Sequence, residues 1–158
     1  MTLTRSIVLP SSEATEALGM VIAKWTPKGS VLFLQGNLGA GKTTFVRGFL
    51  KALGHRASVK SPTFTIVETY RLTAGLVFHF DLYRIESPEE LEWLGINEYF
   101  FRESIVLIEW AEKGEGCLPI SDIKIAFEIR HGGRQATVEV AQKDNLVPLE
   151  KVLKAKFA

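Results

Sequence analysis

The chain has 158 residues, of which 46% are hydrophobic and 23% charged, and its 19 basic and 18 acidic residues give a formal net charge of +1. This composition is typical of a globular domain, and the length predicts one domain over residues 1–158. The near-neutral charge argues against a strongly basic nucleic-acid-binding protein, so any contact with nucleic acid is expected to be local or indirect. The apolar runs are far shorter than the roughly 20 residues that cross a bilayer, which excludes a transmembrane protein.

The N-terminal segment and the cysteine content predict a cytoplasmic protein. Cys117 is the one cysteine, so no intramolecular disulfide can form. The N-terminus lacks the apolar core and the small-residue cleavage site of a signal peptide. No repeat or low-complexity linker divides the chain, and we expect no internal domain boundary.

The first third of the chain predicts a helix, a buried strand and a second helix. Apolar residues at helical spacing predict a helix over residues 14–24, capped by Ser11 or Ser12. The apolar run Val31–Leu34 is typical of a strand buried on both faces. Helical spacing returns over residues 42–53, with a glycine at its end.

The middle of the chain predicts a hairpin followed by a short helix. Two β-rich runs cover residues 64–72 and 76–83 and are joined by a turn that contains glycine. A helix is expected over residues 88–94, with Ser87 as its N-cap and Pro88 at its first position.

The remaining residues complete an α/β fold. The all-apolar run Ile105–Ile108 predicts a second buried parallel strand, and residues 122–130 and 135–141 alternate as an antiparallel hairpin does. Residues 143–154 are expected to pack as a terminal segment with solvated charges. Together these elements predict a sheet that is parallel at its centre and antiparallel toward its edges, with helices on both faces.

A glycine-rich motif predicts a phosphate site. Residues 36–43, GNLGAGKT, fit G-x-x-x-x-G-K-[ST] at every fixed position and lie between the predicted strand and helix. The glycines let backbone N–H groups wrap a phosphate chain, and the helix adds its positive end. Lys42 would reach the β- and γ-phosphates and the Thr43 hydroxyl would bind Mg²⁺, as in a P-loop NTPase. The alternative is a glycine-rich turn before an ordinary helix.

Two carboxylates at predicted strand ends are candidates for the metal side of this site. Glu109 follows the uninterrupted run Ile105–Ile108 and is the first choice for holding the metal or its water. Asp81 ends a weaker strand and is the candidate for a second carboxylate nearby. A solvated charge for Glu109 and a salt-bridged hairpin residue for Asp81 are the alternatives.

Other residues leave two interpretations open. Thr63 or Thr65 follows the P-loop helix, where a γ-phosphate sensor is found in many such proteins, but both also suit the entry to a strand. Trp110 would be either a core residue or a cover on the nucleotide. The histidines have no metal-ligand spacing, and the absence of a GTPase base-reading motif favours adenine.

Several motifs in a fixed order resemble one family. They are S-x-x-x-T-x-x-L-G from Ser11, the P-loop, SPTFT from Ser61, HFDLYR from His79 and IEW from Ile108. The chain resembles the TsaE family, also known as YjeE, over nearly its whole length. That resemblance implies a small Mg²⁺-dependent bacterial ATPase that works with TsaD and TsaB to form threonylcarbamoyladenosine beside the anticodon of tRNA, with tRNA bound through the complex and hydrolysis resetting it.

The resemblance also implies roles for individual residues. Lys42, Asp81 and Glu109 would be catalytic, and Thr43 and Glu109 would serve Mg²⁺. The residues expected to bind ATP are Ser11, Thr15, Gly36, Asn37, Leu38, Gly39, Ala40, Gly41, Lys42, Thr43 and Thr44. A small-molecule kinase and a nucleotide-dependent binding module remain the alternatives. No arginine lies in a recognisable catalytic motif, which predicts slow hydrolysis by the isolated chain.

Overall fold

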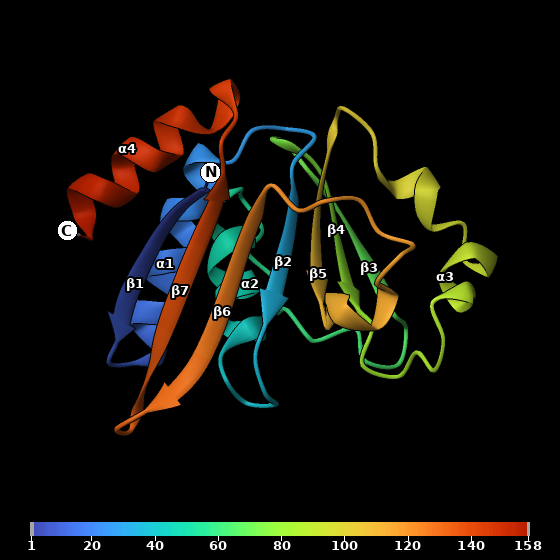
Figure 1. Cartoon of the computed structure of the whole chain (residues 1–158), viewed down its shortest axis with the longest axis horizontal. Helices are drawn as coiled ribbons and strands as arrows, with labels where there is room; N and C mark the ends of the chain where they lie inside the picture. Colours follow the sequence, from blue (N-terminus) through green and yellow to red (C-terminus); the bar gives the residue numbers. More distant parts are fainter. Residues whose placement is uncertain (1, 158) are drawn as a thin grey trace.

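The computed structural model describes residues 2–157, which build one seven-stranded sheet flanked by helices (Figure 1). The strands are β1 (Thr2–Leu9), β2 (Val31–Gln35), β3 (Val67–Leu72), β4 (Gly75–Asp81), β5 (Ser104–Glu109), β6 (Ile123–Arg130) and β7 (Gly133–Ala141). The helices are α1 (Ser12–Trp25), α2 (Lys42–Ala52), α3 (Glu89–Trp93) and α4 (Val147–Lys156), and short 3₁₀ turns cover Ile96–Tyr99, Ala111–Gly114 and Asp144–Leu146.

The strand order β1-β7-β6-β2-β5-β4-β3 confirms the predicted mixed sheet. Strand β2 pairs in parallel with both β5 and β6, and β4 pairs in parallel with β5. The β3–β4, β6–β7 and β1–β7 pairs are antiparallel and complete the edges. The apolar runs in β2 and β5 suit the two central positions, because both faces of these strands are covered.

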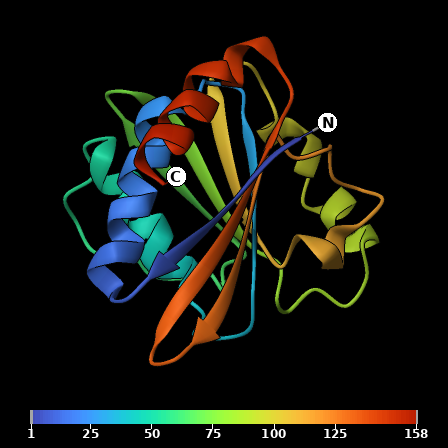
Figure 2. The same ribbon diagram turned by 60° about the vertical axis from the view of Figure 1, so that its left-hand side comes forward.

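Two hydrophobic cores lie on opposite faces of the sheet. Helices α1, α2 and α4 cover one face, while α3 and the 3₁₀ turns near it cover the other (Figure 2). Along β5, Leu107 belongs to the first core, and Val106 and Ile108 belong to the second. This alternation turns Glu109 toward the face that carries α2.

Glycines bring α1 and α2 into close contact. A Cβ atom at Gly19 would overlap the carbonyl oxygen of Phe45, and one at Gly48 would overlap that of Glu16. The two helix backbones therefore approach more closely than larger residues would allow. Their packing fixes the start of α1 beside the loop that precedes α2.

Two local predictions differ from the structure. Strand β3 begins at Val67 rather than at residue 64, because the chain turns first: the Ile66 N–H donates to the Pro62 carbonyl at 2.7 Å, and Ile66 has a φ of 71°. Ser87 does not cap α3, whose N-cap is Pro88.

The carboxylate of Glu90 instead holds the two residues that precede the N-cap of α3. It accepts the backbone N–H groups of Glu86 and Ser87 at 2.6 and 2.9 Å, which lowers the pKa of Glu90. Strand β1 was not among the predicted elements, although its pairing with β7 closes one edge of the sheet. None of the helices within residues 2–157 has the length and apolar character needed to cross a membrane.

Candidate functional site

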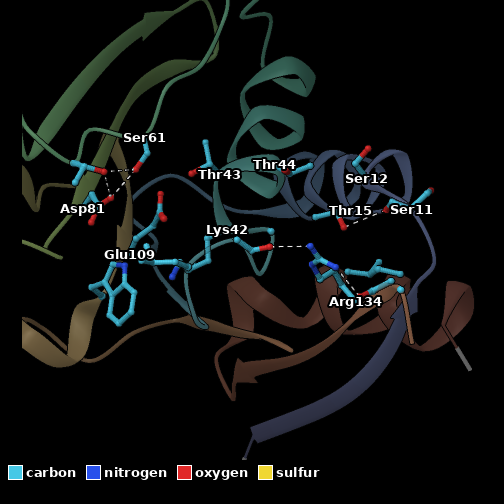
Figure 3. A pocket seen from close by; sticks show the side chains of 18 residues that line it. Ser11, Ser12, Thr15, Lys42, Thr43, Thr44, Ser61, Asp81, Glu109 and Arg134 are labelled. Carbon is cyan, nitrogen blue, oxygen red and sulfur yellow. Dashed lines mark hydrogen bonds between the residues drawn. The ribbon is translucent and has the colours of Figure 1, made fainter. Parts of the chain in front are cut away.

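A cavity of about 410 Å³ lies at the carboxyl ends of the central strands (Figure 3). Its walls come from the start of α1, the loop before α2, the ends of β4 and β5, and the turn between β6 and β7. The lining residues are Leu9, Ser11, Ser12, Thr15, Leu38, Gly39, Gly41, Lys42, Thr43, Thr44, Ser61, Thr63, Asp81, Glu109, Trp110, Gly132, Gly133 and Arg134. Crevices at this edge of a parallel sheet are the usual place for ligands in α/β folds.

The phosphate loop, residues 36–43, requires its glycines. Gly36, Gly39 and Gly41 have φ values of 143°, 78° and 115°, a region that side chains with a Cβ rarely adopt. At Gly36 a Cβ would also lie 2.7 Å from the carbonyl oxygen of Phe127 on β6. The loop therefore depends on backbone freedom and on close contact with the neighbouring strand.

The first turn of α2 is prepared for an anion. Gly41 is the N-cap and provides no side-chain hydrogen bond, and the first turn carries no acidic residue. The first N–H groups of a helix lack intrahelical acceptors and carry partial positive charge. Because Gly41, Lys42, Thr43 and Thr44 all line the cavity, these groups are available to a phosphate.

Lys42 lines the cavity, and its ammonium group points to the loop before α2 and to the ring of Trp110. The residue is only 5% exposed, and its Nζ donates to the carbonyl oxygens of Gly36 and Asn37. Burial lowers the pKa of Lys42, and the negative charges of Glu109 and Asp81, together with that of Glu112, partly offset this effect. A phosphate would replace the weak carbonyl partners by a charged one.

Glu109 and Asp81 end neighbouring parallel strands and occupy paired register positions. Figure 3 shows Glu109 between Asp81 and Lys42. The Glu109 carboxylate is 2% exposed, and its Oε2 lies 2.6 Å from Nε2 of His79. Neither carboxylate is a freely solvated charge.

Asp81 organises the loop that follows α2. Its Oδ2 accepts the hydroxyls of Ser61 at 2.6 Å and Thr63 at 3.0 Å, and its Oδ1 accepts the N–H of Tyr83 at 2.9 Å. Thr63 thus lies in the site, whereas Thr65 is exposed and donates to Glu68 at 3.0 Å. Of the two candidate sensor residues, only Thr63 lines the cavity.

The opposite end of the cavity contains the start of α1 and Arg134. The Ser11 hydroxyl accepts the N–H of Ala14 and so caps α1, and the Thr15 hydroxyl donates to the Ser11 carbonyl at 3.4 Å. Arg134, at the start of β7, donates from Nη2 to the Gly39 carbonyl at 2.9 Å. The place of Arg134 in the site could not be predicted from the sequence, because this contact joins residues that are far apart in the chain.

Three of the predicted loop residues lie behind the lining. Gly36, Asn37 and Ala40 do not face the cavity: the first two present carbonyls to Lys42, and the Ala40 N–H donates to the Asn37 carbonyl at 3.1 Å. These three residues therefore support the conformation of the loop and do not form the cavity wall.

Trp110 lies between the second hydrophobic core and the cavity. The residue is half-buried and packs against the core that contains Phe80 and Ile108, yet it also lines the cavity. Nζ of Lys42 lies 4.1 Å from the centre of its ring, and the Tyr83 ring lies 5.0 Å away. Its backbone adopts a φ of 59°, outside the usual range for tryptophan.

The donor atoms at the acidic end fit Mg²⁺. The Thr43 hydroxyl and the Glu109 carboxylate would supply hard oxygen ligands, and Mg²⁺ commonly combines one or two carboxylates with phosphate and water oxygens. Within residues 2–157 no group of three or more His, Cys, Asp or Glu side chains is arranged to hold a metal by itself.

Comparison with known proteins identifies the family. The family model described as "Threonylcarbamoyl adenosine biosynthesis protein TsaE" matches residues 9–137. The chain belongs to the TsaE family. A relative from Haemophilus influenzae, "tRNA threonylcarbamoyladenosine biosynthesis protein TsaE", is 48% identical over 121 residues, which are 77% of this chain and 75% of the relative. A TsaE protein of the same description from Bacillus subtilis is 42% identical over 73% of this chain and 72% of its own length.

A solved structure supports the TsaE fold. The crystal structure of Bacillus subtilis YdiB superimposes with a TM-score of 0.83 at 30% sequence identity, covering 98% of this chain and 97% of the other. The resemblance drawn from the ordered motifs is thereby confirmed. So is the predicted α/β fold with a parallel centre.

Proposed function

We propose that this chain is a Mg²⁺-dependent ATPase that acts in the formation of threonylcarbamoyladenosine in tRNA. One observation carries the ATPase assignment: a single cavity brings Lys42 and Thr43 of the phosphate loop against Glu109 and Asp81 at the strand ends. The printed names of the TsaE relatives support the role in tRNA modification.

The cavity divides along its length into regions with different chemistry. The N–H groups of the first turn of α2 and the Lys42 ammonium bind the β- and γ-phosphates at the centre. Figure 3 shows Ser11, Thr15 and Arg134 at the end of the cavity away from Glu109, and we assign the nucleoside to that end. We assign ATP rather than GTP as the nucleotide because the sequence lacks a GTPase base-reading motif.

The other end of the cavity carries the groups for hydrolysis. Thr43 and Glu109 would hold Mg²⁺, which when bound neutralises charge on the β- and γ-phosphate oxygens. Asp81 holds the hydroxyls of Ser61 and Thr63, and thereby keeps the loop after α2 next to the terminal phosphate.

The distribution of basic groups favours a partner-dependent enzyme. Among residues 2–157, Lys42 and Arg134 are the basic residues that line the cavity, and Figure 3 shows Arg134 at the end away from Glu109. An arginine supplied in trans can accelerate phosphoryl transfer by roughly 10³- to 10⁵-fold. We assign the completing role to a complex of TsaD and TsaB, with tRNA bound through that complex because the chain itself has a net charge of only +1.

Steady-state ATP hydrolysis tests this proposal. The purified chain is assayed alone, then with TsaD and TsaB, with and without tRNA, and Lys42→Ala serves as the inactive reference. We expect slow hydrolysis that the partners accelerate, no hydrolysis by Lys42→Ala, and a metal requirement that Thr43→Ala shifts to higher Mg²⁺ concentration.

Two outcomes would contradict the proposal. Fast hydrolysis that TsaD and TsaB leave unchanged removes the case for a partner-completed ATPase. Transfer of the γ-phosphate to a small-molecule acceptor, in place of release as inorganic phosphate, would establish the kinase alternative.

A further inference from the structure

A buried histidine lies directly behind the acidic end of the cavity. His79 is 0% exposed and occupies β4 two residues before Asp81. Because side chains alternate along a strand, His79 and Asp81 share the face turned toward α2. His79 is absent from the cavity lining, so it contacts Glu109 from behind rather than meeting a ligand.

The hydrogen bonding of His79 assigns its tautomer. Nδ1 is buried and has no hydrogen-bond partner within the described residues, whereas Nε2 lies 2.6 Å from Oε2 of Glu109. An ionised carboxylate oxygen only accepts hydrogen bonds, so a contact of this length requires a proton on Nε2. The proton therefore sits on Nε2, which donates to the carboxylate.

This contact leaves the two oxygens of Glu109 in different environments. Oε2 is held by His79, while Oε1 accepts no hydrogen bond from any group in residues 2–157. Glu109 itself lines the cavity beside Lys42 and Thr43. The terminal torsion of a glutamate side chain is broad, so without a fixed partner the carboxylate plane would rotate.

We infer that His79 is a positioning residue for Glu109: its Nε2–H holds Oε2 and thereby aims Oε1 at the metal and phosphate side of the cavity. The inference rests on the proposed function of Glu109 as a ligand for Mg²⁺. Partners that hydrogen-bond to a ligating carboxylate orient it, and losing one typically weakens metal binding or activity about 10- to 100-fold.

Two substitutions at position 79 separate orientation from simple packing. His79→Gln places an amide Nε2 at the same number of bonds from the backbone as the imidazole Nε2, so it can still donate to Glu109. His79→Asn is also neutral and polar, but its shorter amide reaches only the position of Nδ1. His55→Gln, at a half-buried histidine outside the cavity lining, is the matched control.

The first measurement is the affinity of Mn²⁺ for the chain in the presence of ADP, followed by electron paramagnetic resonance. ADP affinity in EDTA and the thermal unfolding midpoint are measured alongside it. We expect His79→Asn to weaken Mn²⁺ binding about 10- to 100-fold and to leave metal-free ADP affinity within about two-fold of wild type. His79→Gln is expected to restore most of the Mn²⁺ affinity, and His55→Gln to behave as wild type.

The second measurement is nitrogen NMR of the nucleotide-free chain with labelled histidine. We expect a proton on Nε2 of His79, whose signals are assigned by their loss in His79→Gln. A ring without a proton on Nε2 would overturn the inference.

Two further results would also overturn it. Wild-type Mn²⁺ affinity in His79→Asn shows that Glu109 needs no orienting partner. If His79→Asn and His79→Gln both lose metal-free ADP affinity and thermal stability to the same extent, and His79→Gln does not recover Mn²⁺ affinity, His79 has a role in packing alone. Because none of these readouts requires hydrolysis, an inactive wild-type chain would defeat the proposed ATPase without deciding the role of His79.

Discussion

The guanidinium of Arg134 donates a hydrogen bond to the carbonyl oxygen of Gly39 at 2.9 Å, across 95 residues of sequence. Its Nη1 also donates to the carbonyl of Gly133 at 2.9 Å, so one side chain ties the start of β7 to the phosphate loop. The phosphate loop is therefore held from the opposite side of the cavity.

Replacing Arg134 should weaken nucleotide binding. Arg134→Ala removes a cation from the cavity and a charged donor from the loop, and we expect ADP affinity to fall by about ten-fold. The ADP affinity of Arg134→Lys should lie between those of the wild type and Arg134→Ala, because lysine keeps the positive charge but lacks the paired N–H donors of the guanidinium. Arg130→Ala, at an exposed residue paired with Glu128 in the same hairpin, is the control. Calorimetric titration with ADP measures the wild type and the three variants. Equal affinities would show that Arg134 does not contribute to nucleotide binding.

Nucleotide affinity should depend on the charge of Lys42. Burial lowers the pKa of this residue below its ordinary value of 10.5, and bound phosphates favour the charged form and raise it again. ADP affinity should therefore be constant near neutral pH and fall, by up to about ten-fold per pH unit, as the pH rises through the pKa of the free chain.

Lys42→Arg provides the control for this pH profile. Arginine stays charged throughout the range, so its affinity, whatever its absolute value, should lack this decline. Fluorescence-detected ADP titrations between pH 7 and 10.5 make the comparison. A wild-type affinity that stays flat to pH 10.5 would contradict the lowered pKa.

The two strand-end carboxylates should differ in their effect on turnover. Glu109→Gln removes charge beside Lys42 and should reduce ATP turnover by roughly 10²-fold while ADP binding partly survives. Asp81→Asn loosens the contacts to Ser61 and Thr63 and should slow turnover less. Glu103→Gln, exposed just before the opposite end of β5, controls for general effects. A large loss confined to Asp81→Asn would reverse the order of the two residues.

Trp110 should report nucleotide binding. A variant that retains only this tryptophan, with Trp25 and Trp93 replaced by Phe, should change its emission on ATP addition, because the ring lies 4.1 Å from Nζ of Lys42. The matching variant that retains only Trp93, which is 81% exposed and outside the cavity lining, should not respond. Emission that ignores saturating ATP in the first variant would place the indole away from the nucleotide.

The close packing of α1 against α2 should make Gly48 sensitive to substitution. Gly48→Ala adds a methyl group against the backbone of Glu16, which can move only if the whole helix moves. We expect a net loss of about 1–3 kcal/mol in the free energy of unfolding, despite the better helix propensity of alanine. Arg47→Ala, exposed on the same helix, should change it by less than about 0.5 kcal/mol. Urea denaturation measures both, and greater stability of Gly48→Ala would show that the helices can separate.

Local sequence pattern predicted much of this protein. The phosphate loop is a contiguous segment whose glycines, lysine and threonine act through nearby backbone, so its position between β2 and α2 follows from the order of residues alone. Glu109 and Asp81 were predicted at strand ends because an apolar run followed by a carboxylate is visible in one short window. Boundaries were less well predicted where a turn with a positive φ, as at Ile66, delayed the start of a strand.

Tertiary structure alone decided which distant groups meet. The His79–Glu109 pair depends on the parallel register of β4 and β5, and the Arg134–Gly39 contact depends on β7 folding back past β6 to reach the phosphate loop. Strand order and register are set by the burial of both hydrophobic cores at once, a property of the whole chain that no short window of sequence contains. For the same reason only the folded chain distinguished Thr63, held by Asp81 inside the cavity, from Thr65, two residues later and outside it.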